Sequence, residues 1–210
     1  AIRVLPPFRA AVRVHLVEVN PTLRHHQVKA LAEVGEVFWH ERIDDVPKGP
    51  SIILANEYFD VLPVHQMVRQ PDGWHERVVE IDAAGTLAFG VAPKPSLQFE
   101  ALLPARVAAA PPGAIFEWRP DSEIMRIAAR VRDFGGAALV IDYGHLHSDA
   151  GDTFQAIARH AFADPLKNPG QADITAHVDF EALAQAAEAA GARTHGPVEQ
   201  GAFLRSLGIE

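Results

Sequence analysis

The stretch SIILANEYFDVLP, residues 51–63, constrains the fold of this chain more than any other. It begins with the apolar run Ile52–Ala55 after a Gly-Pro pair, a pattern typical of a strand buried on both faces of a parallel sheet. The polar residues Asn56, Glu57 and Asp60 follow directly. In open parallel α/β sheets, ligands bind just beyond the carboxyl ends of the strands. The stretch therefore predicts either a site for a cationic or hydrogen-bond-donating substrate or, more simply, a strand followed by a solvated loop.

An earlier apolar segment also ends in an acidic residue. Residues 12–19 predict a strand that ends at Glu18, and residues 21–34 predict the helix that follows it. In nucleotide-binding α/β folds, an acidic residue at the end of the second strand accepts hydrogen bonds from ribose hydroxyls. Glu18 stands in that place, although a carboxylate beside a helix N-terminus or in a solvated loop fits equally well.

A third short strand is predicted over residues 37–39, and its end is aromatic and acidic. In nucleotide-binding folds of this class, the loop after this strand lines the adenine. Trp39 or His40 could stack on the ring there, and Asp44 could bind its amino group. The alternative is that Trp39 belongs to the core, as a tryptophan at a strand end usually does.

Residues 64–91 depart from simple βαβ alternation. Three short strands with turns at residues 71–73 and 84–85 predict a small antiparallel meander, inserted after the strand at 52–55. Such an insertion could face the substrate, bind a partner or present only a solvated surface. The Pro-rich residues 92–113 read as a connection rather than a domain linker.

The block DITAHVDF, residues 173–180, ends a polar segment and begins a helix near Asp179. His177 stands just before that helix. A histidine in this place can act as a base, as a hydrogen-bond partner of the substrate, or as a plain helix cap. Position alone does not choose among these roles, because the chain carries 11 histidines.

Five blocks of the chain resemble the MidA family of class I S-adenosylmethionine-dependent methyltransferases. They follow the order of the family and cover nearly the whole chain: VHLVEVNP at 14–21, NEYFDVLPV at 56–64, GWHERVV at 73–79, ALVIDYGH at 138–145 and DITAHVDF at 173–180. The mitochondrial member of this family is an arginine methyltransferase needed for complex I assembly. The resemblance implies an α/β, Rossmann-like class I methyltransferase sheet with the meander inserted, and a segment at 151–180 that covers the site.

The resemblance also implies a cofactor, an acceptor and their binding residues. The cofactor is S-adenosylmethionine, and the acceptor is an arginine of a protein substrate, such as a respiratory complex I subunit. Because the strand at 137–141 neighbours the strand at 52–55 in this fold, Asp142 would lie beside Asn56, unless it only forms a turn. The expected cofactor-binding residues are Glu18, Trp39, His40 and Asn56, and the expected catalytic residues are Glu57, Asp60, Asp142 and His177.

Composition excludes several classes of protein and several kinds of site. The 210 residues suit one domain, residues 1–210, and no apolar run approaches the length of a membrane span. The chain has no cysteine, which rules out disulfides and thiolate catalysis and fits a bacterial cytoplasm. A net charge of −8 argues against nucleic acid as the main partner. No pair of histidines has the spacing of a metal site, so we expect no metal.

One expected motif is missing from the sequence. Class I methyltransferases bind the cofactor with a Gly-rich loop after the first strand, and no E-x-G-x-G motif occurs in this chain. We therefore expect the chain to be an internal piece of a longer methyltransferase, with an incomplete sheet. We also expect the isolated piece to bind no cofactor and to associate into oligomers through unpaired strand edges.

Two other functions compete with methyl transfer. A non-catalytic assembly factor could keep the fold and bind a partner through the meander, but it would have no need for the acidic strand ends. A nicotinamide-dependent enzyme would require a G-x-G-x-x-G loop and gives no role to Asn56 and Glu57.

Overall fold

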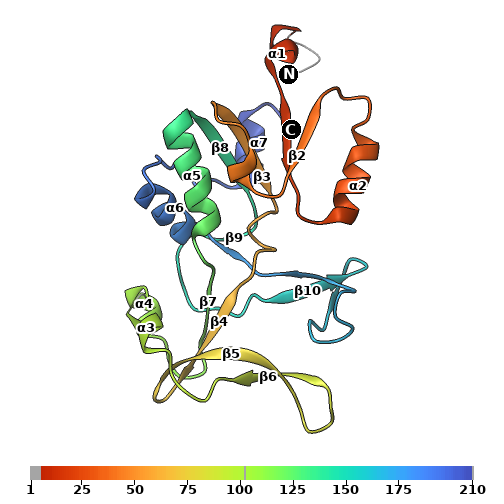
Figure 1. Cartoon of the computed structure of the whole chain (residues 1–210). Coiled ribbons are helices and arrows are strands. Elements are labelled where there is room, and N and C mark those ends of the chain that lie inside the picture. Colours follow the sequence, from red (N-terminus) through yellow and green to blue (C-terminus); the bar gives the residue numbers. More distant parts are fainter. Residues whose placement is uncertain (1–5, 102, 210) are drawn as a thin grey trace. The chain divides into compact units, whose positions relative to one another are not determined.

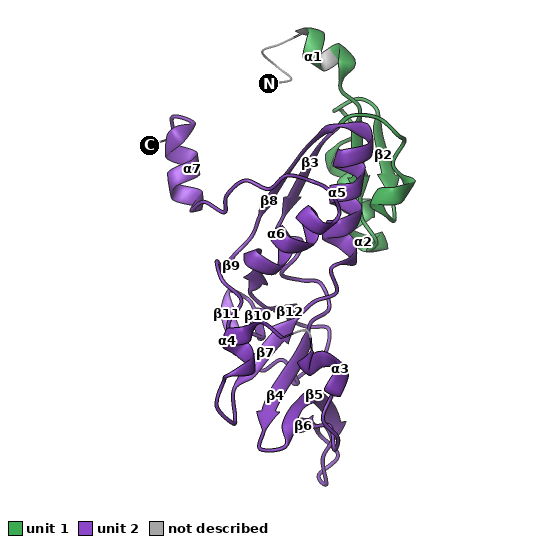
Figure 2. Ribbon diagram, turned by 90° about the vertical axis from the view of Figure 1, so that its left-hand side faces the viewer, with its two compact units in different colours: residues 1–50 green, residues 51–210 purple. Residues whose placement is uncertain are grey.

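The computed structural model describes residues 6–101 and 103–209, which divide into two compact units at residues 1–50 and 51–210 (Figure 2). Figure 1 labels their helices and strands. The interpretation of residues 1–210 as one domain stays a prediction, and each unit is described by itself. Along the described residues, no helix combines the length and the apolar character that crossing a membrane requires.

The first unit is a β-α-β element. Its parts are α1 (Pro6–Ala11), β1 (Val14–Val17), α2 (Pro21–Ala30), β2 (Val37–His40) and the short 3-10 helix η1 (Ile43–Asp45). The two strands pair in parallel, from Val14 opposite Val37 to Val17 opposite His40. The strand predicted over residues 12–19 is shorter than expected because β2 offers only four residues to pair with.

Helix α2 begins at Pro21, where the sequence predicts, and the structure shows that Asn20 caps it. The Asn20 side chain accepts hydrogen bonds from the backbone N–H groups of Thr22 and Leu23, at 2.9 and 3.2 Å. Pro21 follows as the first helical residue, where a missing N–H costs nothing. The helix ends at Ala30 rather than at residue 34, and a turn carries the chain on to Gly35.

The second unit is centred on a parallel pair of strands. β3 (Ser51–Asn56) and β8 (Gly136–Ile141) pair in full register, from Ser51 opposite Gly136 to Asn56 opposite Ile141. This confirms the prediction that the two strands are neighbours. The carboxyl ends of both strands therefore lie side by side, and the polar residues that follow them are close together.

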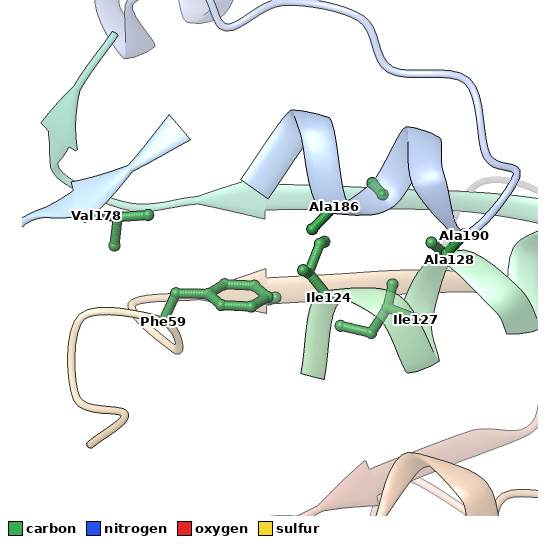
Figure 3. Packing of buried hydrophobic residues seen from close by; sticks show 9 residues of the cluster. Phe59, Ile124, Ile127, Ala128, Val178, Ala186 and Ala190 are labelled. Carbon is green, nitrogen blue, oxygen red and sulfur yellow. The ribbon is translucent and has the colours of Figure 1, made fainter. Parts of the chain in front are cut away.

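Two helices pack against this pair of strands and form the main core. They are α5 (Ser122–Phe134) and α6 (Phe180–Ala189). Figure 3 shows Phe59, Ile124 and Ala186 meeting in this core. Its buried residues are Ala55, Phe59, Ile124, Ile127, Ala128, Val178, Ala186, Ala187 and Ala190.

The prediction that the strand is buried on both faces is wrong. Ile52 and Leu54 are 75% and 70% exposed, whereas Ala55 is buried and Ile53 packs against the core. The physical reason is that α5 and α6 cover only one face of the strand pair. Because successive side chains of a strand point to opposite faces, every second apolar side chain of β3 points away from the core.

The predicted antiparallel meander is confirmed. β4 (His65–Gln70), β5 (Gly73–Ile81) and β6 (Leu87–Val91) pair antiparallel in sequence. A fourth strand, β7 (Ile115–Trp118), pairs antiparallel with β4. With the short helices α3 (Leu97–Glu100) and α4 (Ala105–Ala108), the sheet encloses a second core of Met67, Trp74, Val107 and Phe116.

Short strands complete the second unit. β9 (Gly144–His145) pairs in parallel with β13 (Val178–Asp179). The segment 151–180 contains β10 (Gln155–Ala158), β11 (Ala161–Ala163) and β12 (Asp173–Thr175), which form a sheet in the order β11-β10-β12. Helix α7 (Gln200–Ser206) follows near the end of the chain.

Candidate functional site

The polar loop after β3 reverses the chain directly behind the strand. The Glu57 backbone N–H still donates to the Ile141 carbonyl at 2.8 Å, which extends the pairing of β3 with β8 by one residue. Glu57 then adopts a φ of 47°, in the left-handed region that residues other than glycine rarely occupy. Its side chain stays exposed, as does that of Asn56.

Two aromatic side chains hold this loop in place. Phe59 is 2% exposed and lies in the main core. The Tyr58 hydroxyl donates to the Glu123 carboxylate of α5 at 3.1 Å. Burial, followed by the negative charge of Glu123, raises the pKa of Tyr58 to about 12. Tyr58 is therefore protonated at neutral pH and remains a hydrogen-bond donor.

Asp142 fixes the loop from the neighbouring strand. One oxygen accepts the backbone N–H groups of Phe59 and Asp60 at 3.0 and 3.3 Å, and the other accepts the Tyr143 N–H at 2.9 Å. Burial raises the pKa of Asp142, and the nearby Asp60 carboxylate raises it further, against the lowering by the three N–H donors. The structure therefore gives Asp142 a positioning contact, and its expected catalytic role stays a prediction.

Arg119, which the sequence analysis missed, connects the loop to the segment before α6. Its guanidinium donates to four backbone carbonyls: Asp60 at 3.2 Å, Leu62 at 3.4 Å, Ala176 at 2.7 Å and His177 at 2.7 Å. Burial lowers the pKa of Arg119, opposed by attraction to Glu117, Asp142 and Asp60. The only sequence signal was an arginine between a strand and Pro120, which does not reveal its partners.

His177 lies beside Tyr143 but makes no side-chain hydrogen bond within the described part of the chain. The two rings meet edge to face, with centroids 5.6 Å apart and planes at 88°. The His177 backbone N–H donates to the Thr153 hydroxyl at 2.8 Å, and that hydroxyl donates to the Glu117 carboxylate. Burial raises the pKa of the Tyr143 phenol, a hydrogen bond with Thr175 opposes this, and the carboxylates of Asp60 and Asp142 raise the pKa further.

A cavity of about 460 Å³ opens where these elements meet. It brings together Glu57 and Asp60, two of the four expected catalytic residues, with Tyr143; Asn56, Asp142 and His177 are not among its lining residues. The whole lining is Glu57, Asp60, Val61, Tyr143, Ile157, Ala172, Asp173, Ile174 and Thr175. The segment 151–180 thus forms one wall, while its expected role as a cover stays a prediction.

In the first unit, the expected cofactor residues are joined through Gln27, which the sequence analysis did not single out. The Gln27 amide donates to Glu18 at 3.0 Å and accepts the Trp39 indole N–H at 3.0 Å. The other Glu18 oxygen accepts the Asn20 N–H at 2.8 Å. A carboxylate offers about four acceptor positions, so two remain for the hydroxyls of a ribose. This half-buried carboxylate therefore fits the nucleoside of S-adenosylmethionine.

Two other candidates in this unit, His40 and Asp44, already contact neighbouring side chains. The His40 ring stacks on His15 with centroids 5.1 Å apart, and Nε2 of His40 lies 2.9 Å from Nδ1 of His15. Asp44 pairs with Arg42 at 3.1 Å. Within residues 6–101 and 103–209, no three His, Asp or Glu side chains are grouped as a metal ion would require.

Comparison with known proteins gives one consistent result. Residues 1–198 match the model of a family described as "Putative S-adenosyl-L-methionine-dependent methyltransferase". The chain is 34% identical to "Protein arginine methyltransferase NDUFAF7, mitochondrial" of Homo sapiens, covering 95% of this chain and 49% of the relative. It is also 34% identical to the Caenorhabditis elegans homologue, covering 95% and 51%. The chain thus spans about half the length of the curated relatives that it matches.

Two crystal structures from Burkholderia thailandensis are similar to this chain. One holds bound S-adenosyl-homocysteine and is 28% identical, with a TM-score of 0.76 over 94% of this chain and 52% of that one. The other, an uncharacterised protein, is 31% identical, with a TM-score of 0.79 over 93% and 54%.

Proposed function

Because the chain belongs to the family of S-adenosylmethionine-dependent methyltransferases whose model it matches, the MidA family that its motifs resemble, we propose that the whole protein methylates arginine in a protein substrate. The observation that carries the proposal is the cavity where Glu57 and Asp60 meet without any lysine, arginine or histidine in the lining. Such a cavity favours a cation. The relatives named as protein arginine methyltransferases support arginine as that cation.

The residues of this chain have limited but defined tasks in such a reaction. The cofactor supplies a methyl group already activated on a sulfonium centre, so the protein must bind, orient the acceptor and exclude water. A carboxylate binds the planar guanidinium of arginine through two parallel hydrogen bonds. Glu57 and Asp60 would hold the acceptor and balance its charge, while Arg119 and Asp142 keep the loop that carries them in place. Glu18 would bind the ribose hydroxyls.

The experiment is a labelling reaction with the whole protein. It would be incubated with S-adenosylmethionine carrying a labelled methyl group and with proteins extracted from cells that lack it. Mass spectrometry would then locate the label. The proposal expects label on arginine side chains. Label on other residue types would refute the arginine acceptor, and unlabelled protein would refute the methyltransferase activity.

A non-catalytic assembly factor is the second candidate, favoured by one observation. Val79, Ile81, Leu87 and Val91 are 53%, 73%, 40% and 43% exposed on the β5–β6 hairpin. These four side chains lie on one face of the hairpin. Val79 and Ile81 are two positions apart on β5, and Ile81 lies opposite Leu87 on β6. Val91 is four positions from Leu87 on β6, so it points to the same face. An apolar face of this kind suits a protein partner. This candidate expects partner binding without any transfer of label.

We also propose a substrate, an oligomeric state and a cellular location for the whole protein. A respiratory complex I subunit as the substrate and self-association of the protein come from the motif resemblance and from the strand edges. A bacterial cytoplasmic location comes from the composition, whereas the relatives named above are mitochondrial. Size-exclusion chromatography and cell fractionation of the whole protein would test the last two directly.

A further inference from the structure

The cavity of about 460 Å³ has acidic side chains in its lining and no basic ones. Three carboxylates line it, those of Glu57, Asp60 and Asp173, together with the Tyr143 phenol. Arg119, which attracts Asp60, has its guanidinium directed at four backbone carbonyls. The negative charge of the cavity is therefore available to a ligand of opposite sign.

Two buried polar atoms beside this charge make no hydrogen bond of ordinary geometry in the part of the chain that the structure describes. They are Oδ1 of Asp60 and Oγ1 of Thr175, on side chains that belong to residues only 3% and 8% exposed. Buried polar atoms in native proteins are almost always hydrogen-bonded. Asp60 and Thr175 both line the cavity beside the Tyr143 phenol, whose pKa responds to both side chains, so these three residues form one polar wall of the cavity.

A second cavity of about 240 Å³ adjoins the first and differs from it in chemistry. Asp60, Ile174 and Thr175 line both, so the two cavities share a wall. The rest of the second lining is apolar: Leu62, Pro63, Val64, Phe154 and Ala176. A ligand that fills both cavities carries a cationic and a separate apolar side chain, as a peptide does, whereas a polyamine has only methylene spacers between its cations.

Two of the three shared residues, Ile174 and Thr175, belong to β12, an edge strand of its sheet. β12 pairs with β10, from Gln155 opposite Thr175 to Ile157 opposite Asp173, and no strand among the described residues pairs with its other edge. An open strand edge can accept an extended peptide through main-chain hydrogen bonds, with pockets reading its side chains. Here both cavities are lined by residues of β12.

We propose that the protein substrate binds as an extended segment along the free edge of β12. A cationic side chain of the segment enters the cavity of Glu57, Asp60 and Asp173, and an apolar side chain nearby enters the second cavity. Asp173 is then a specificity-determining residue that selects basic segments. The inference rests on the proposed function in that the cation is taken to be the acceptor arginine.

The test is peptide binding to the whole protein, measured by calorimetry. The probe is a short synthetic peptide with a central arginine and a leucine two residues later, because alternate side chains of an extended chain share a face. Asp173→Asn should weaken its binding about three- to tenfold, and Asp173→Glu should restore it. Asp164→Asn is the matched control, since Asp164 lies exposed in the same segment, caps a turn and lines neither cavity.

The strand pairing has its own probe. N-methylation of successive backbone amides of the peptide leaves its charge intact and removes one donor at a time. At least one such peptide should bind about tenfold more weakly than the parent. Equal affinity of all N-methylated peptides, or competition by spermidine as strong as that by the parent peptide, would overturn the inference.

The two proposals can fail separately. Label transferred to arginine together with unchanged peptide affinity in Asp173→Asn would overturn the binding mode and leave the function standing. The expected pattern of affinities without any transfer of label would overturn the proposed function and leave the binding mode standing. Circular dichroism and the unfolding midpoint of each variant show that a loss of binding does not come from misfolding.

Discussion

Oδ2 of Asp142 accepts a hydrogen bond from the backbone N–H of Phe59 at 3.0 Å, across 83 positions of the sequence. The same oxygen accepts the N–H of Asp60. The loop that carries the candidate acceptor residues is therefore positioned by the end of the neighbouring strand, and not by local sequence alone.

Weakening the acceptor contacts of Asp142 should destabilise the protein. Asp142→Asn keeps one oxygen but places an amide N–H₂ group where a second acceptor was. We expect the free energy of unfolding to fall by about 1.5–3 kcal/mol, the usual worth of hydrogen bonds to a charged group. Urea denaturation of the whole protein measures it. Asp133→Asn, on an exposed aspartate paired with Arg132, is the control and should leave stability unchanged.

Arg119→Lys should lower the stability of the protein although it keeps the positive charge. A lysine ammonium cannot reach all four carbonyls that the guanidinium joins, so buried acceptors lose their donors. A loss of about 2–3 kcal/mol in the free energy of unfolding is expected. Arg106→Lys, on the exposed side of α4, provides the comparison. Equal stability of the two variants would remove Arg119 from its positioning role.

Two aspartates at helix N-termini should show opposite pH dependence. Asp179 caps α6 by accepting the Ala182 N–H at 2.9 Å. Burial alone would raise its pKa, but hydrogen bonds from His145, Ser148 and the Ala182 N–H lower it below 3.8. Its stabilisation is therefore complete above pH 3.8 and is lost as the pH falls through the lowered value. Asp179→Ala should cost about 1 kcal/mol at neutral pH and less in acid.

Asp121, at the start of α5, is the matched comparison, because its side chain caps no backbone N–H. Burial and the charge of Asp179 raise its pKa above 3.8. Its contribution to stability is then largest below pH 3.8 and falls as the pH rises through the raised value. Urea denaturation of wild type, Asp179→Ala and Asp121→Ala between pH 3 and 7 would check both signs. Parallel pH profiles for the two variants would contradict this account.

The sequence was sufficient for features that depend on neighbours along the chain. Glu57 and Asp60 follow an apolar run directly, so their place at a strand end could be predicted. Gln27 and Arg119 could not, because their roles come from partners brought together only by folding. The exposure of Ile52 was also beyond prediction, since an apolar run does not reveal which face of the strand a helix covers.

In the first unit, Glu18→Ala should weaken the binding of S-adenosylmethionine to the whole protein. The loss of one charge-assisted contact to the ribose is worth about 1.5–3 kcal/mol. Calorimetric titration measures it. Glu36→Gln, an exposed acid of the same unit, should bind the cofactor as wild type does. Equal affinity of Glu18→Ala and wild type would take Glu18 out of the cofactor site.

The most direct test of the central claim is methyl transfer by Glu57→Gln in the whole protein, measured beside its affinity for S-adenosylmethionine. The substitution keeps the shape of the side chain and removes the charge that would balance the acceptor guanidinium. We predict nearly unchanged cofactor affinity and at least a tenfold loss of turnover, about 1.4 kcal/mol of transition-state stabilisation. Transfer to arginine at the wild-type rate would contradict the claim that this loop holds the acceptor.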